Sequence, residues 1–583
     1  MTRRGSIILC GFVFLFALLG LQSWSIAVAR VEQRVIAAIE ARTGLVVTGM
    51  ERAEIALLPL PRISLSNVAF AERERQVAGR ALRIRAHARL LPLLVGRIDF
   101  DRIDLVAPEI DLAVTAGDGS LPDLLGAPLG YLESLQGQSR IVVTSGSFFL
   151  RSQGAIRTIL RDVNLVLDER EATEPVAIAG SLNWRGVPTE VNLLWPVAAG
   201  PGRATLNVNA PLLKLQFDGS RSNSAEPTTA GHVTLATPSL PELLAWFGEA
   251  PRLAPAVGAL NLTAEALIRP HDVALGNVVA RLDGDRLDGA LNLGLASGRL
   301  ALSGTLAGAQ LDLGRMISRL EVADLGGTGD DAPLPFEAWT AQDIDLRVSV
   351  ETARIDGTKL GDVATYLLVK KGRFEAGILR AGVYGGSVKG RLLATAAPIG
   401  IDVKLTAALD KVSFGEAGTN FPRLARLSGT GNVQLNLEGF GRSRQEVIAS
   451  ASGKASLNLR QGELAGFAFG DLLRRAERSP TAALRDWRQG RTAFETASAS
   501  AAIANGVLTL ADAQMVGAGY RMTLTGTASL PTRELDMAVQ LQPANGGTLR
   551  LPFSLRGPVA DPSLELEPEA ILRPSGSGPL PLR

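Results

Sequence analysis

The sequence is poor in cysteine, in aromatic residues and in net charge. Its 583 residues contain one cysteine, Cys10, which excludes an intramolecular disulfide and a cysteine-based metal cage. Lysine plus arginine (60) nearly balance aspartate plus glutamate (58), so the concentrated basic surface that nucleic acids require is not indicated. Aromatic residues make up 5%, too few for a platform that stacks bases. We therefore expect no nucleic-acid partner.

The usual signatures of catalysis and cofactor binding are also missing. The three histidines, His87, His232 and His271, are far apart and form no metal-binding motif. No phosphate-binding loop of the GxxxxGK[ST] type occurs, and Gly429-Thr430-Gly431 lacks the third glycine of a dinucleotide site. Acidic residues are numerous but scattered. The sequence thus predicts no enzyme, no cofactor and no metal site.

The amino-terminal region holds a long uncharged run. Arg3 and Arg4 precede the run from Gly5 to Ala29, and a helix of about 20 apolar residues suffices to span a bilayer. Basic residues on the short flank favour a cytoplasmic amino terminus. We predict that residues 1–29 form a cytoplasmic tip and a single transmembrane anchor, and that the rest of the chain is exported. The anchor would present Ile7, Leu15, Leu21 and Val28 to lipid.

A cleaved signal peptide is the alternative to a retained anchor. Ala27-Val28-Ala29 has the small-x-small pattern of a cleavage site. However, an amphipathic helical pattern continues from Val31 to Ile39, and Thr43-Gly44 ends it. This continuity favours the anchor.

After Gly44 the dominant pattern is an alternation of apolar and polar residues, which is typical of half-buried strands. Asx-Gly pairs such as Asp356-Gly357 and Asn505-Gly506 predict tight turns between them. We therefore expect a mainly β fold built as a meander, a sandwich or an extended antiparallel sheet. The predicted strands include these alternating apolar sets: Ile63 and Leu65; Leu82, Ile84 and Leu90; Ile110, Leu112 and Val114; Leu260 and Leu262; Leu291, Leu293 and Leu295; Val433, Leu435 and Leu437; Leu535, Met537, Val539 and Leu541; Leu551, Phe553 and Leu555.

Three short helices are predicted between the strands. Ser239 and Glu242 form a capping box that starts the first, and Gly248 ends it. Leu313, Met316, Ile317 and Leu320 have helical spacing, and a third helix starts at Ser479-Pro480 and ends near Gly490.

Segments rich in glycine, serine and proline, at 219–227 and 326–335, suggest boundaries. After the anchor we predict a first β domain (30–225), a middle β region with short helices (226–410), a carboxyl-terminal β domain (411–565) and a disordered tail (566–583).

A basic cluster lies on one predicted strand. Arg83, Arg85, His87 and Arg89 share one face, because alternate residues of a strand point the same way. They form either a solvated face or a contact for anionic head groups near the membrane, through Arg83, Arg85 and Arg89.

Several motifs, in order along the chain, resemble the AsmA family. The amino-terminal ones are residues 39–44 (IEARTG), Leu57 to Pro61 (LLPLP) and Ile63 to Val68. The carboxyl-terminal ones are Val383-Tyr384-Gly385-Gly386, Leu427 to Gly431 (LSGTG), Gly462 to Gly466 (GELAG) and Asp561-Pro562. The resemblance extends over most of the chain, and residues 150–340 match in style only.

The resemblance implies a bacterial inner-membrane protein with a periplasmic body and no known catalysis or cofactor. It implies a long, curled antiparallel β-sheet groove that binds or conveys phospholipid toward the outer membrane. On this reading the lipid-facing residues would be Val433, Leu435, Leu437, Leu535, Met537, Val539 and Leu541. An alternation of apolar and polar residues is compatible with an open trough and with a closed core, so two alternatives stay open. One is a non-lipid scaffold or regulator that contacts outer-membrane assembly components, and the other is an envelope enzyme.

Overall fold

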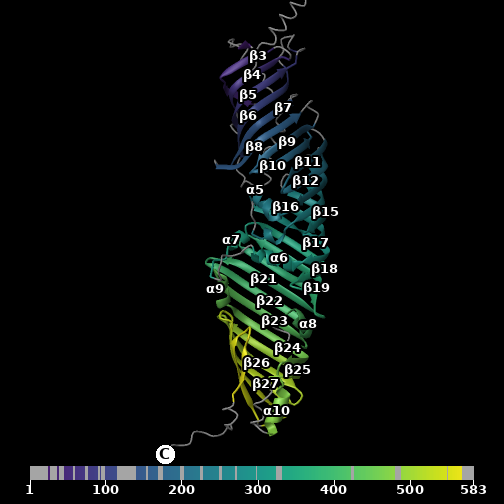
Figure 1. Cartoon of the computed structure of the whole chain (residues 1–583), viewed down its shortest axis with the longest axis vertical. Helices are drawn as coiled ribbons and strands as arrows, with labels where there is room; N and C mark the ends of the chain where they lie inside the picture. The colour runs from purple at the N-terminus through teal and green to yellow at the C-terminus, as the bar shows by residue number, and fades with distance from the viewer. Residues whose placement is uncertain are drawn as a thin grey trace, which may run out of the picture. The chain divides into compact units, whose positions relative to one another are not determined.

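The computed structural model describes Trp24–Ser25, residues 36–37 and most of residues 45–567 (Figure 1). Within the last range it leaves out 57–59, 73–76, 90–91, 93–98, 115–139, 153–154, 169–174, 197–201, 223–227, 249–251, 270–271, 297–298, 323–330, 422–425, 479–487 and 548. No helix in the described part is long and apolar enough to cross a membrane. The predicted anchor residues Ile7, Leu15, Leu21 and Val28, and residues 568–583 of the predicted tail (566–583), lie outside the described residues. Leu566, at the start of the predicted tail, ends strand β30 (Ser563–Leu566).

The described chain is mainly β and divides into two units. Unit 1 comprises Met1–Ala250, Val257–Gly284 and Ala290–Ala301, and unit 2 comprises Pro251–Ala256, Asp285–Gly289 and Leu302–Arg583. The predicted boundary at 225/226 falls between two strands of unit 1, β12 (Leu213–Arg221) and β13 (Thr229–Thr237). The one at 410/411 falls inside a strand of unit 2, β22 (Gly400–Ser413).

The described part of unit 1 contains a run of strands and the helix α5 (Leu240–Phe247). The other strands are β1 (Trp24–Ser25), β2 (Leu45–Gly49), β3 (Arg52–Ala56), β4 (Arg62–Glu72), β5 (Val77–Ala88), β6 (Phe100–Val114), β7 (Arg140–Ser152), β8 (Ala155–Asp168), β9 (Val176–Trp184), β10 (Val187–Trp195), β11 (Gly202–Ala210), β14 (Leu260–Ile268) and β15 (Asp272–Leu282). The division between the units passes through β16 (Asp285–Ala296) and β17 (Arg299–Asp312).

Unit 2 contains the remaining strands and helices. They are η1 (Ala254–Ala256), α6 (Leu313–Val322), α7 (Phe336–Trp339), β18 (Asp343–Ile355), β19 (Thr358–Lys370), β20 (Arg373–Val383), β21 (Gly386–Ala397), α8 (Phe414–Asn420), β23 (Thr430–Gly441), α9 (Arg444–Ala449), β24 (Ser452–Ala465), α10 (Phe469–Arg478), β25 (Arg491–Ala504), β26 (Val507–Gly517), β27 (Tyr520–Ser529), β28 (Glu534–Pro543), β29 (Leu551–Pro558) and β30 (Ser563–Leu566).

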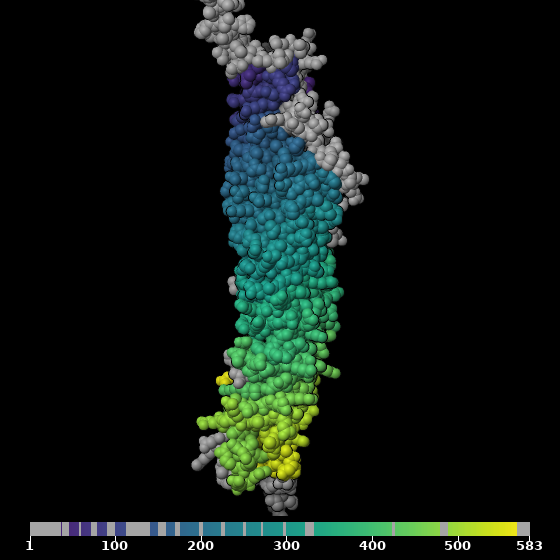
Figure 2. Space-filling view, turned by 90° about the vertical axis from the view of Figure 1, so that its right-hand side faces the viewer, coloured from purple at the N-terminus to yellow at the C-terminus, as the bar shows by residue number. Residues whose placement is uncertain are grey.

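Each strand from β18 to β30 pairs antiparallel with the next strand in the sequence. Figure 2 shows the surface of unit 2 changing from teal through green to yellow-green and yellow, with yellow-green and yellow atoms side by side at its end. Asp356-Gly357 and Asn505-Gly506 form two of the connecting turns, and all four residues have positive φ (45°, 80°, 50° and 72°). This is the conformation of the tight hairpin turns predicted at these sites.

Unit 1 departs from the prediction in two places. Trp24–Ser25 pair with Ile55 and Glu54 of β3, so the helix predicted from Gly5 to Ala29 is wrong at these two residues, whose backbone belongs to a sheet. β6 and β7 pair in parallel, so the sheet is mixed and not wholly antiparallel. A parallel pair needs a crossover connection of a dozen or more residues, and the chain between Val114 and Arg140 is long enough to supply it.

The α5 helix begins and ends where its capping residues predict. The Ser239 side chain accepts a hydrogen bond from the backbone N–H of Glu242, and Gly248 ends the helix with φ at 93°. Trp246 on this helix donates its indole N–H to the carbonyl of Trp184 at 2.9 Å. Both tryptophans belong to a cluster that covers one end of strands β9–β13.

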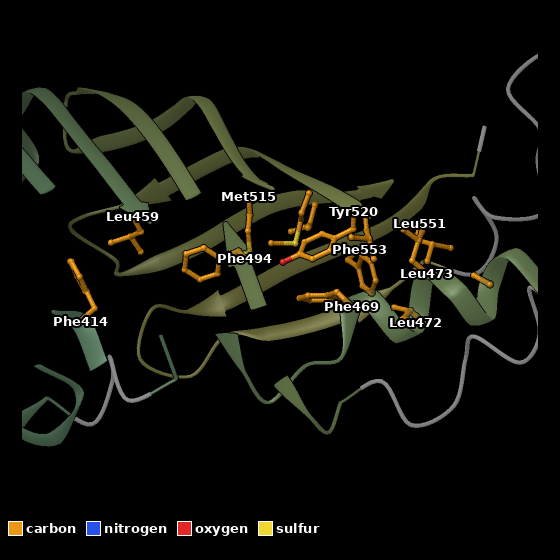
Figure 3. Packing of buried hydrophobic residues seen from close by; sticks show 14 residues of the cluster. Phe414, Leu459, Phe469, Leu472, Leu473, Phe494, Met515, Tyr520, Leu551 and Phe553 are labelled. Carbon is orange, nitrogen blue, oxygen red and sulfur yellow. The ribbon is translucent and has the colours of Figure 1, made fainter. Parts of the chain in front are cut away.

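A closed core lies at the carboxyl-terminal end of unit 2, where α10 packs on the sheet. Figure 3 shows Phe469, Leu472 and Leu473 on the helix side of this core. The Phe469 and Phe553 rings meet edge to face with centroids 5.7 Å apart. The buried members of the core are Phe414, Leu459, Phe469, Leu472, Leu473, Ala476, Phe494, Met515, Tyr520, Met522, Val539, Leu541, Leu551 and Phe553.

Thr492 on β25 fixes the start of α10. Its hydroxyl accepts a hydrogen bond from the Phe469 N–H at 3.0 Å and donates one to the Phe467 carbonyl at 2.7 Å. The helix predicted from Ser479 is not described over 479–487, whereas α10, which ends at Arg478, was not predicted.

The core under α10 predicts a large effect of truncating Phe553. Phe553→Ala removes a ring that is 1% exposed, and should lower the free energy of unfolding of unit 2 by about 3–5 kcal/mol. Denaturant titration followed by circular dichroism measures the change. The control is Leu379→Ala on β20, whose side chain is 56% exposed, and it should change the free energy by less than about 0.5 kcal/mol. Equal effects of the two substitutions would contradict the closed core.

Candidate functional site

The candidate site is an aliphatic surface in the middle of strands β21–β24. Directly paired residues place Leu392, Leu405 and Leu437 in one row across the strands, and Ala407, Leu435 and Ala455 in the next. All of these side chains are partly exposed, and Leu392 is 37% exposed. We call this surface the open apolar face, and it consists of Leu392, Leu405, Ala407, Leu409, Leu435, Leu437 and Ala455.

The other face of the same strands is polar and exposed. On β23 the residues that alternate with the apolar ones are Asn432, Gln434, Asn436 and Glu438. Lys404 on β22 pairs with Glu438 at 2.9 Å. This division follows from the period of two in a strand, which sends successive side chains to opposite faces. The polar face therefore keeps the strands in water while the apolar face has no polar groups of its own.

The apolar face is closed at one end of the run of strands and open in the middle. Val433 and Leu457 border the core under α10. Beyond them, where α10 lies on the sheet, Val539 and Leu541 are 3% and 0% exposed. The same alternation of residues thus gives full burial where α10 covers the strands and partial exposure in the middle of β21–β24.

A second helix covers the apolar face near one end of β20–β22. Phe336 of α7 is 6% exposed and packs with Ala394 and Ile401, which are 8% and 4% exposed. Phe374 and Val403 pack against the same cluster. Leu405 follows Val403 on the same face of β22. It is the first residue on that face of the strand that lies outside this cluster.

The open apolar face can hold hydrocarbon. Burial of one methylene contributes about 0.8 kcal/mol, and the face supplies aliphatic contacts without polar competition. Four strands are separated by three spacings of about 4.8 Å, so the face extends about 14 Å across the sheet. That is comparable with the reach of one acyl chain, which is half of a bilayer core of about 30 Å, or about 15 Å.

The seven predicted lipid-facing residues divide into three environments. Leu435 and Leu437 belong to the open apolar face, with Val433 at its border. Leu535 and Met537 on β28 are partly exposed. Val539 and Leu541 lie in the closed core, where α10 covers them. The prediction missed Leu392, Leu405 and Ala407, although β22 shows the same alternation from Ile401 to Leu409.

The predicted head-group residues lie on the outer side of β5, opposite the buried Ile84 and Ala86. Arg83 and Arg85 have no carboxylate partner among the described residues, whereas Arg89 lies 3.5 Å from Asp99. His87 on the same face lies 3.3 Å from Asp104.

Leu82 is 59% exposed, so its predicted place on the apolar face with Ile84 is wrong. Ala81 takes the buried position, because the alternation shifts between Ala81 and Ile84.

A charged cluster stabilises the polar face of β20. The Glu375 carboxylate is 8% exposed and accepts hydrogen bonds from Arg373 at 2.6 Å and from Tyr366 at 2.8 Å. Arg391 lies 2.8 Å from the same carboxylate. Burial alone would raise the pKa of Glu375, but the hydrogen bonds and the charges of the two arginines lower it to about 2. Gly377 gives the Tyr366 ring room, since a Cβ atom there would lie 2.4 Å from it.

No group of His, Cys, Asp or Glu side chains that could hold a metal ion occurs within the described ranges.

Residues 330–513 match the model of the AsmA family. This segment is an AsmA family domain. The AsmA segment contains all four strands of the open apolar face, together with α7 and α10. With the open β-sheet it marks a membrane-associated envelope protein. No curated protein matches the chain.

The Glu375 cluster predicts a pH dependence of stability. The folded-state pKa of about 2 lies below the ordinary value of 4.5, so the cluster stabilises the fold above about pH 4.5. The contribution, up to about 2 kcal/mol, is lost as the pH falls from about 4.5 to about 2. Glu375→Gln should therefore unfold at a lower denaturant concentration than the unaltered chain at pH 6. Denaturant titrations at several pH values should show the difference shrinking toward pH 2, and a difference independent of pH would contradict the assignment.

Proposed function

We propose that the chain is anchored in the bacterial inner membrane and binds or conveys phospholipid along the open apolar face. Its amino terminus would be cytoplasmic and its bulk periplasmic, and it would support the biogenesis of the outer membrane without catalysing a reaction. The observation that carries the proposal is the partial exposure of Leu405, Leu435 and Leu437, in contrast with the burial of Val539 and Leu541.

Two further observations support this function. An aliphatic surface left in contact with water is costly, and large ones usually mark a binding site for an apolar partner. The surface lies inside the AsmA segment, whose family resemblance implies lipid transport. The uncharged run from Gly5 to Ala29 would keep the chain at the membrane that supplies the lipid. A scaffold for outer-membrane assembly components would require no such surface.

Photo-crosslinking tests which side chains meet lipid. A photoreactive amino acid replaces Leu435, Gln434 or Val539, one at a time, in cells labelled with a phospholipid precursor. We expect labelled lipid to be attached at position 435, because its side chain is on the open apolar face. Position 434 is the matched control on the polar face of the same strand, and position 539 is the control beneath α10. Lipid at none of the three positions in a folded protein would favour the scaffold.

A pair of charge substitutions gives an independent test. Leu435→Glu places a carboxylate where an acyl chain would lie, whereas Gln434→Glu adds the same charge to the exposed face. Since burying an unpaired charge costs several kcal/mol, phospholipid that copurifies with the chain should fall at least about fivefold for Leu435→Glu. It should stay unchanged for Gln434→Glu. Mass spectrometry of the extracted lipids measures both, and circular dichroism confirms that both variants fold. An equal lipid content in the two variants would refute binding at this face.

A further inference from the structure

Three arginines on the outer side of β4 and β5 lack a carboxylate partner among the described residues. They are Arg62, Arg83 and Arg85. Arg83 lies directly opposite Ser66, and Arg85 directly opposite Ser64. Directly opposed side chains have Cβ atoms about 5 Å apart and diagonal neighbours about 7–8 Å apart, so the three guanidinium groups form one array with two hydroxyl groups between them.

The carboxylates near this array are engaged elsewhere. Asp104 on β6 is opposite Arg85 in the register, but it bonds Arg102 at 2.6 Å and lies 3.3 Å from His87. Glu54 on β3 is opposite Ser64 and lies 3.9 Å from Arg52. The three unpaired arginines therefore repel one another unless an anion approaches them. Arginine prefers phosphate, which it can bind through two parallel hydrogen bonds.

Two exposed leucines flank the array and indicate which kind of anion it would bind. Leu60 precedes Arg62 by two residues, Leu82 immediately precedes Arg83, and each is 59% exposed. They are among the most exposed large apolar residues of the described chain. A free phosphate would bind the arginines alone and leave both leucines in water. Arginines beside exposed leucines are the combination that binds a membrane surface, where phosphate groups lie next to acyl chains.

The position of these strands in the sheet agrees with a membrane contact. β1 pairs with β3, β3 pairs with β4, and β4 pairs with β5. Trp24–Ser25 of β1 belong to the uncharged run from Gly5 to Ala29. Three strand spacings of about 4.8 Å place β5 about 14 Å from β1. A membrane that takes up the uncharged run would therefore lie within reach of this surface.

We propose that Arg62, Arg83 and Arg85, with Leu60 and Leu82, form a docking surface for anionic phospholipid head groups of the membrane that anchors the chain. The proposal replaces Arg89, which is paired with Asp99, by Arg62 in the predicted head-group set. It rests on the proposed membrane association and not on lipid binding by the open apolar face. The docking surface would hold unit 1 against the bilayer through charge and through shallow insertion of the two leucines.

The test uses the full chain in lipid nanodiscs. Cys10 is replaced by serine, and Leu82→Cys carries an environment-sensitive fluorophore. The nanodiscs contain either phosphatidylcholine alone or phosphatidylcholine with phosphatidylglycerol, and a fraction of the lipid carries a quencher at the head group. We expect quenching in the anionic nanodiscs, little in the neutral ones, and a decrease with added salt, because salt screens exposed charges. A fluorophore at Leu379→Cys in unit 2, equally exposed to solvent, is the label control.

The charge variants decide whether the arginines are responsible. Arg62→Gln, Arg83→Gln and Arg85→Gln together should abolish the quenching at position 82, since each arginine near an anionic surface contributes about fivefold to the contact equilibrium. The matched control replaces Arg203, Arg286 and Arg556 by glutamine, three exposed arginines that each have a carboxylate partner, and should leave the quenching unchanged.

Equal quenching in neutral and anionic nanodiscs, quenching that survives the triple substitution, or no quenching at all would overturn the docking surface. Lipid crosslinking at Leu435 is measured in the same variants. In the chain with all three arginines intact, crosslinked lipid without quenching in anionic nanodiscs would show that the docking surface fails while the proposed function holds, and quenching without crosslinked lipid would show the reverse.

Discussion

A strand has two faces, and the apolar one must be covered by something. In the long antiparallel runs of strands, each strand pairs with the next, and this pairing satisfies the backbone hydrogen bonds. It does not cover the aliphatic side chains, which need a separate partner. In unit 2 the cover is partial. α10 and α7 each close a part of the apolar face, and between them the side chains of the open apolar face remain partly exposed. The proposed lipid binding depends on this incomplete cover.

Alternation in the sequence was enough to predict most of the local structure. β4, β14, β23, β28 and β29 lie where apolar and polar residues alternate, and α5 lies where its capping box predicts. α10 was missed, although Phe469, Leu472, Leu473 and Ala476 have the spacing of a helical face. The parallel pairing of β6 and β7 depends on the course of a long connection, which no local pattern encodes.

The environments of individual site residues were less predictable, for a physical reason. Leu435 and Val539 lie in strands with the same alternation, yet Leu435 is partly exposed and Val539 is 3% exposed. The difference comes from α10, which lies about 60 residues before Val539 in the sequence. Likewise, Arg89 and Arg85 share a face, but Arg89 lies 3.5 Å from Asp99, whereas Asp104, directly opposite Arg85, bonds Arg102 and lies 3.3 Å from His87. Contacts between residues far apart in the sequence therefore determine whether such a side chain is buried or paired.

The pairing of successive strands also determines the order in which unit 2 can assemble. Nearly all its strand contacts are local in sequence, which favours rapid folding by the addition of one hairpin at a time. α10 and α7 are exceptions, because α10 contacts β28 and α7 packs on Ile401 of β22, and both strands are synthesised later. During synthesis α10 therefore waits for its partner strands, and the end of the sheet that it closes is sealed only after β28 and β29 have been added.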